Sequence, residues 1–217
     1  MASGTDWVVG TLTDGAGALH SAVLPACRSL RMMRPTHPAI VLGSSQDESD
    51  VDADFCRGNG IEVVRRRSGG GAVFVHPSDS VWVDIVIPHD DPLWLDDVGQ
   101  AMVWVGEMWR DVLTAAGMSG LSVHAGPLVG NDWSKTLCFA GVGTGEVMCG
   151  DAKVVGISQR RTREGARFQC SAYRRWDPTV MLGALPLLAN DRDRLVSLVA
   201  TVPSGFTAGS LVPALPH

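Results

Sequence analysis

Two stretches of the chain each contain a pair of strand-like segments joined by a connection too short for a crossover helix. In residues 71–88 the segments "GAVFVH" and "SVWVDIVIP" flank the turn cluster "PSD", and in residues 145–156 "GEVMC" and "AKVVG" flank the dipeptide "GD". Strands joined by so few residues run antiparallel, whereas parallel strands need a connection of a dozen or more. We therefore expect an α+β fold with a mostly antiparallel, mixed sheet that is flanked by helices.

Helical patterns separate these groups of strands. Between Val98 and Ala116 apolar residues recur at spacings of three and four, after Asp96-Asp97 and before Gly117, which predicts a long helix with an apolar stripe in the core. Shorter helices are expected at 14–32, 50–60 and 191–201, and strands at "PAIVLG", "IEVVRR", "LSVHAG", "KTLCFAG" and "ARFQCSAY". In "SVWVDIVIP" the alternation places Val81, Val83, Ile85 and Ile87 on one face, with Trp82 and Asp84 on the other.

Composition excludes several classes of protein. The 217 residues are 45% hydrophobic and 19% charged, as in a folded globular chain, and we expect one domain over 1–217 without a separate C-terminal accessory domain. A net charge of −5 argues against nucleic acid as a partner. No apolar run reaches the ~20 residues that cross a bilayer, and the start "MASGTDWVVG" lacks a signal peptide, so a cytoplasmic protein without a membrane partner is expected. The five cysteines show no metal-binding spacing, so no metal site is expected.

The stretch "EVVRRRSGGGAVFVH" (62–76) is the strongest functional signal. Three consecutive glycines are costly to order, and they are used where a backbone must approach another group closely. Their amides can bind an anion or a carbonyl oxygen, and the arginines before them can add bidentate donors for phosphate or carboxylate. The spacing matches neither the dinucleotide-binding pattern nor the P-loop. The residues alone leave two interpretations open, an anion or acyl-carbonyl site and a flexible turn.

This stretch resembles the "RRxSGGGAV" loop of the superfamily of lipoate-protein ligases, octanoyltransferases and biotin-protein ligases. The segment "GDAKVVGIS" is similar to the lysine strand of that superfamily, and "VLGSSQ" (41–46) resembles the strand end that lines its acyl pocket. The resemblance covers roughly residues 38–175 and implies the mixed, mainly antiparallel sheet of the biotin/lipoate ligase catalytic domain. It implies that the substrate is bound by Arg66, Ser68, Gly69, Gly70, Gly71, Ala72, His76 and Gly156, with Arg65 and Gln46 as further candidates.

His76 stands one residue later than the usual position in this superfamily. Because successive side chains of a strand point to opposite faces, this offset turns His76 to the other face unless a bulge absorbs it. Its pKa near neutrality would otherwise suit a proton shuttle.

Lys153 and Cys138 are the expected catalytic residues. Lys153 is one of only two lysines in the chain, and an ammonium aimed at an acyl oxygen stabilises the charge of a tetrahedral intermediate. A group of octanoyltransferases has a nucleophilic cysteine in a "CF" pair about fifteen residues before the strand lysine, and Cys138-Phe139 has this spacing here. Arg66 or Lys153 could supply the positive field that a thiolate needs. The alternative is a buried strand cysteine, and Cys170 is a second candidate nucleophile.

The resemblance implies acyl transfer in lipoate metabolism, in which an octanoyl or lipoyl group passes from acyl carrier protein through Cys138 to a lysine of a lipoyl-domain protein without a cofactor. The first alternative is a lipoate-protein ligase that forms lipoyl-AMP from ATP with Mg. Ligases usually carry an Asn-Asp pair close before the lysine strand, where this chain has "AGVGTGEV" (140–147), so the ligase is disfavoured. The second alternative is a non-catalytic relative that binds an acyl group or biotin.

Overall fold

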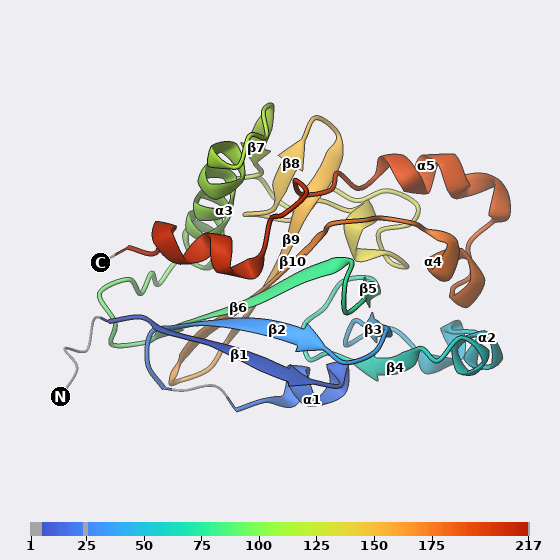
Figure 1. Ribbon diagram of the computed structural model, residues 1–217, viewed down its shortest axis with the longest axis horizontal. Helices are drawn as coiled ribbons and strands as arrows, with labels where there is room; N and C mark the ends of the chain where they lie inside the picture. The colour runs from blue at the N-terminus through green and yellow to red at the C-terminus, as the bar shows by residue number, and fades with distance from the viewer. Residues whose placement is uncertain (1–5, 24–25, 217) are drawn as a thin grey trace.

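The computed structural model describes residues 6–23 and 26–216, and their strands form two sheets (Figure 1). The larger sheet has the order β1-β2-β6-β10-β9-β8-β7, with β1 and β2 parallel and all other neighbours antiparallel. Its strands are β1 (Val8–Asp14), β2 (Ser29–Pro35), β6 (Ser80–Pro88), β7 (Leu121–Val123), β8 (Val147–Cys149), β9 (Ala152–Arg161) and β10 (Gly165–Tyr173). In the smaller sheet β3 (Ala39–Leu42) lies between the parallel β4 (Glu62–Arg65) and the antiparallel β5 (Val73–Val75). The predicted α+β fold with a mostly antiparallel mixed sheet is confirmed.

Helices cover the sheets from several sides. The α-helices are α1 (Ala16–Ser21), α2 (Ala53–Gly58), α3 (Val98–Ala115), α4 (Thr179–Ala184) and α5 (Arg192–Ser197). Four 3₁₀ helices complete the described elements, namely η1 (Glu48–Asp50), η2 (Cys138–Ala140), η3 (Ala189–Asp191) and η4 (Ala208–Ala214). Helix α3 lies on one face of the larger sheet beside η4, whereas α2 and α4 lie at the end of the molecule near the smaller sheet (Figure 1). The long predicted helix and the expected helices near 50–60 and 191–201 are therefore present.

The main core lies between α3 and the larger sheet. Val105 and Trp109 of α3 are fully buried against a cluster that contains Val83 and Ile85 of β6, and the central part of the predicted stripe is confirmed. The opposite face of β6 carries Trp82, which packs with residues of α1, β3 and β5. Since the smaller sheet covers this second face, any space left between the two sheets is walled by both of them.

The predicted helix over 14–32 is wrong for most of its length. Residues 8–14 form β1, the helix is limited to α1, and residues 29–35 form β2. Leu, Arg and Met favour helices, but Met32 and Met33 pair with Val83 and Trp82 of β6. Pairing with a buried strand of the sheet thus overrides the local helical preference.

Two further expectations at the strand level need correction. The segment "KTLCFAG" is not a strand, because it contacts the glycine loop through an isolated bridge between Ala72 and Leu137 and then forms η2. The strands β5 and β6 are joined by a short turn but belong to different sheets, so they do not form a ladder.

The β8–β9 hairpin with its Gly-Asp turn is confirmed. Helix α4 was not anticipated from the sequence.

Within the described ranges, no helix combines the length and apolar character that a bilayer crossing requires.

Candidate active site

Arg66 organises the glycine loop from within. Its side chain is buried directly after β4 and donates to the carbonyl oxygens of Gly69 and Gly71 at 2.7 and 2.9 Å, and to that of Val41 at 3.0 Å. Its Nε donates to Oγ of Ser68 at 3.1 Å. These four hydrogen bonds hold the loop carbonyls inward, so that the expected substrate-binding arginine acts first as the internal support of the loop.

Close approach of other backbone segments requires glycine at positions 43 and 71. A Cβ on Gly43 would lie 1.8 Å from the carbonyl oxygen of Gly70, and one on Gly71 would lie 2.6 Å from the main-chain N and C of Leu137. Gly70 has φ +94°, a conformation that glycine adopts without strain. In the described part of the chain, the amide N–H groups of Gly69, Gly70 and Gly71 donate to no protein acceptor. The loop therefore presents free amide donors, as the sequence suggested for an anion or carbonyl site.

The glycine loop also fixes the position of Cys138. The Cys138 amide donates to the carbonyl oxygen of Ala72 at 3.0 Å, and the Ala72 amide donates to that of Thr136 at 2.8 Å. Gln46 joins the two segments, because its Oε1 accepts from the Gly43 amide at 2.9 Å and its Nε2 donates to the carbonyl oxygen of Thr136 at 3.3 Å. Ala72 and Gln46 are thus placed to position the segment before Cys138, and Gln46 does not line the cavity described below.

Lys153 lies beneath the same cysteine in the interior of the protein. Its side chain is 1% exposed, and Nζ donates to the carbonyl oxygen of Cys138 at 2.8 Å and pairs with Glu146 Oε2 at 2.6 Å. The ammonium also lies 5.3 Å from the ring centre of Phe139. The sequence predicted an ammonium that faces the acyl group, whereas the structure points it at the Cys138 backbone and at a carboxylate. Lys153 and Cys138 are nevertheless brought together.

Glu146 is the functional candidate that the sequence reasoning missed. Its carboxylate is buried and accepts from the Gly143 amide at 2.7 Å and the Ile157 amide at 3.2 Å, besides pairing with Lys153. The available signal was an isolated acidic residue between a glycine-rich turn and the apolar run of β8, since a carboxylate in such a place needs a buried partner.

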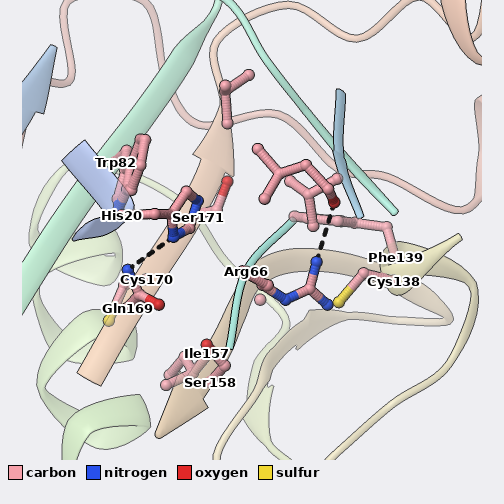
Figure 2. Close-up of a pocket in the computed structure, with 14 residues that line it drawn as sticks. His20, Arg66, Trp82, Cys138, Phe139, Ile157, Ser158, Gln169, Cys170 and Ser171 are labelled. Atoms are coloured by element: carbon pink, nitrogen blue, oxygen red, sulfur yellow. Dashed lines mark hydrogen bonds between the residues drawn. The ribbon is translucent and has the colours of Figure 1, made fainter. Parts of the chain in front are cut away.

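A cavity opens between the two sheets beside Cys138. Val41, Val73 and Val75 of the smaller sheet form one wall, and Trp82, Gly156 and Ser171 of the larger sheet belong to the other. Figure 2 shows the sulfur of Cys138 beside the guanidinium of Arg66, with His20 and Trp82 at the opposite side of the cavity. The lining is predominantly apolar, with a thiol and a guanidinium on one side, which suits an alkyl chain with a reactive end.

His20 and Gln169 provide a polar part of the lining. Burial, assisted by the charges of Arg167 and Arg66, lowers the pKa of His20 to about 3, so its imidazole is neutral near pH 7. Its Nδ1 accepts from Nε2 of Gln169 at 3.2 Å. Asp84, on the second face of β6, pairs with Arg167 and accepts from Nε1 of Trp82 at 2.8 Å. None of these residues carried a sequence motif, because the arrangement depends on the contact of α1 with β6 and β10.

The other residues that the sequence indicated as site residues lie partly in the cavity and partly outside it. Gly156 lines the cavity, where a Cβ would lie 3.3 Å from the Phe139 ring. Cys170 also lines it, but burial raises the pKa of its thiol, which disfavours the thiolate. His76, which was expected to bind the substrate, directly follows β5, lies outside the cavity and contacts Asp79 at 3.4 Å. Arg65 is exposed and lies 3.6 Å from Glu48.

Among residues 6–23 and 26–216, no group of three or more His, Cys, Asp or Glu side chains is arranged to hold a metal ion.

The glycine loop, the buried lysine and the mixed sheet define the class of protein. The model of the lipoyl protein ligase A/B catalytic domain matches residues 18–204, and the chain belongs to this family.

Two similar curated proteins are octanoyltransferases. The chain is 27% identical over 122 residues to octanoyltransferase LipM of Clostridioides difficile (strain 630), a match that covers 56% of this chain and 44% of the relative. It is 29% identical over 135 residues to octanoyltransferase LipM of Moorella thermoacetica, covering 61% of this chain and 48% of the relative. The chain therefore matches less than half the length of each of these relatives.

Solved structures show the same fold. A lipoate-protein ligase A bound with ATP superposes with a TM-score of 0.67 at 18% identity, covering 95% of this chain and 81% of the other. The bipartite lipoate protein ligase of Thermoplasma acidophilum gives a TM-score of 0.63 at 18% identity, covering 95% and 80%. The expected catalytic-domain fold is confirmed.

Proposed function

We propose that the protein is an acyltransferase of lipoate metabolism in which Cys138 carries an octanoyl or lipoyl group as a thioester. The acyl group comes from an acyl carrier protein and goes to a lysine of a lipoyl-domain protein. The observation that carries this proposal is the position of the Cys138 thiol, which lies beside a buried guanidinium at one side of an apolar cavity. The relatives named octanoyltransferase LipM support the reaction class.

The first step forms the enzyme thioester. The Cys138 thiolate attacks the carbonyl carbon of the donor thioester, a new C–S bond forms, and the donor thiolate leaves. The guanidinium of Arg66 lies beside the sulfur of Cys138, where its positive charge would stabilise the attacking thiolate. A Cβ on Gly70 would lie 3.8 Å from the sulfur of Cys138, so the glycine loop with its free amides is close enough to the thiol to supply donors for the oxyanion of the tetrahedral intermediate.

The second step releases the product. The neutral amine of the acceptor lysine attacks the thioester carbon, a C–N bond forms, the Cys138 thiolate leaves, and the amine proton passes to solvent or to the thiolate. Lys153 takes a different part from the one first expected. It holds the Cys138 carbonyl and is neutralised by Glu146, so we assign it as a positioning residue. This reaction needs no ATP and no metal ion.

Intact-protein mass measurement tests the proposal. After incubation with octanoyl-carrier protein, the wild type should gain one octanoyl group, and Cys138→Ala should gain none. Cys149→Ala is the matched control, since Cys149 is also half-buried but does not line the cavity, and it should keep the adduct. Absence of an adduct, together with modification of a lipoyl domain by ATP and lipoate, would establish the ligase reaction instead. Absence of both reactions, with acyl ligands still raising the Tm, would indicate a binding protein.

A further inference from the structure

Five arginines gather at a second pocket next to the acyl cavity. They are Arg65, Arg66, Arg67, Arg160 and Arg167, from the glycine loop and from strands β9 and β10. Arg66, His20 and Gln169 line both pockets, so the two are continuous along one side. Of the five, only Arg65 and Arg66 stand at the two arginine positions of the "RRxSGGGAV" loop described above. The other three come from positions that the proposed chemistry at Cys138 does not use.

Two of these arginines are directly opposed across the sheet. Arg160 of β9 and Arg167 of β10 are partners in the antiparallel ladder, a position where side chains on one face lie about 5 Å apart at Cβ. Like charges in such a pair destabilise a sheet. Arg167 is compensated by Asp84 and by hydrogen bonds to the carbonyl oxygens at the end of α1. Arg160 has no ion-pair or hydrogen-bond partner among the described residues, and neither does Arg67.

The pocket therefore keeps an excess of positive charge in a chain whose net charge is −5. Among the described residues, Asp84 pairs with Arg167 and Glu48 with Arg65, and the charge of Arg65 also acts on Asp47. Burial lowers the pKa of His20, and the charges of Arg167 and Arg66 lower it further. Arginine suits such a place, because its planar fork binds phosphate oxygens in pairs and stays charged.

We propose that this arginine pocket binds the phosphate of a phosphopantetheine arm that delivers the acyl thioester to Cys138. The proposal rests on the proposed function and names the donor class that the site selects. On β9, Ser158 lines the acyl cavity and precedes Arg160 by two residues, or about 7 Å, and Arg66, which lies beside Cys138, lines both pockets. An extended phosphopantetheine arm separates its phosphate from the thioester sulfur by a chain as long as about four residues of main chain, hence about 14 Å. The arginine pocket therefore lies within the reach of this arm.

Paired donors test the proposal. Single-turnover acylation of Cys138 is measured with octanoyl-4′-phosphopantetheine and with octanoyl-pantetheine, which lacks the phosphate. For the wild type we expect the phosphorylated donor to have the higher kcat/KM. In the double variant Arg67→Gln/Arg160→Gln the ratio of the two kcat/KM values should fall about ten- to a hundredfold, as expected when charged hydrogen bonds are lost. The matched control Arg163→Gln removes one charge from the β9–β10 turn outside both pockets, and should keep the wild-type ratio.

Stability and donor selectivity of the variants decide whether the arginine pocket binds the phosphate. Arg160→Gln should fold at least as stably as the wild type, since it relieves the pair with Arg167, and the Tm checks this. An unchanged donor ratio in the double variant would overturn the proposal. Octanoyl-carrier protein and octanoyl-coenzyme A both contain the arm, and both should lose rate in the double variant. A loss confined to coenzyme A would assign the pocket to the nucleotide and overturn the proposal.

Failure of the underlying function gives a different result. If no donor acylates the wild type, the proposed transfer is wrong, and the pocket is then judged by calorimetric titration with 4′-phosphopantetheine alone. Binding that weakens at least tenfold in Arg67→Gln/Arg160→Gln would still support a phosphate site. Absence of binding to the wild type would refute it.

Discussion

Replacing Glu146 by Gln leaves the ammonium of Lys153 buried without its carboxylate. The two side chains are 5% and 1% exposed, and removal of one partner from a pair buried to this degree costs about 3–5 kcal/mol. The side-chain amide of the Glu146→Gln variant cannot accept a hydrogen bond from all three neighbouring donors in either orientation. Its NH2 group faces Lys153 and the Gly143 amide in one orientation and the Ile157 amide in the other, and all three are donors.

For a chain of this length the loss corresponds to a fall in Tm of about 10 °C. Urea denaturation measures the free energy of unfolding of the wild type and of Glu146→Gln. The double variant Glu146→Gln/Lys153→Met should be the more stable of the two variants, because no charge is left unpaired. The control Arg57→Gln breaks an exposed pair with Asp54 and should differ little from the wild type. If Glu146→Gln unfolds as the control does, the buried pair does not stabilise the site as we argue.

Three further predictions concern the loop, the cavity and the thiols. Gly71→Ala should lower the free energy of unfolding by about 1–3 kcal/mol and slow acylation, because its Cβ would press on the backbone that leads to Cys138. In the control Gly69→Ala the new Cβ meets no atom within 4 Å and should be tolerated, so equal losses of stability in urea would contradict this prediction. Since the pKa of His20 is lowered to about 3 in the folded protein, the unfolded chain takes up the proton first, and stability should fall as pH drops from about 6.5 toward 3. His20→Gln should show a smaller fall in unfolding free energy over that range, and an identical pH dependence would refute the assignment. Native alkylation with iodoacetamide, followed by peptide mapping, should label Cys138 well before Cys170, whose thiol pKa is raised by burial; equal labelling rates would refute the ordering.

The parts of the site that could be predicted from the sequence depend on residues that are close together in the chain. The loop from Arg66 to Ala72 was recognisable by its three successive glycines, of which Gly71 is pressed against Leu137 and Gly70 has a positive φ, whereas Gly69 has open space around it. Cys138 and Lys153, which the sequence singled out by their fifteen-residue spacing, lie together in the structure through the Nζ of Lys153 and the carbonyl oxygen of Cys138. The Gly-Asp turn between β8 and β9 was equally local and was correctly predicted, whereas the strands joined by the Pro-Ser-Asp turn belong to different sheets.

The parts that escaped prediction depend on contacts between distant segments. Nothing near Glu146 in the sequence specifies that its carboxylate accepts from the amide of Ile157 and pairs with Lys153. The residues of β2 have helical propensity and become a strand because they pair with β1 and β6. The orientation of Lys153 toward a backbone carbonyl likewise follows from burial and not from spacing.

The most direct test of the central claim isolates the intermediate. The wild-type protein is acylated with octanoyl-carrier protein, freed of donor, and mixed with a lipoyl-domain protein in the absence of ATP. The account predicts that the octanoyl group disappears from the Cys138 peptide and appears on the acceptor lysine at a rate that sustains turnover. An octanoyl group that stays on Cys138, while the acceptor is modified only when ATP and free lipoate are added, would contradict the account.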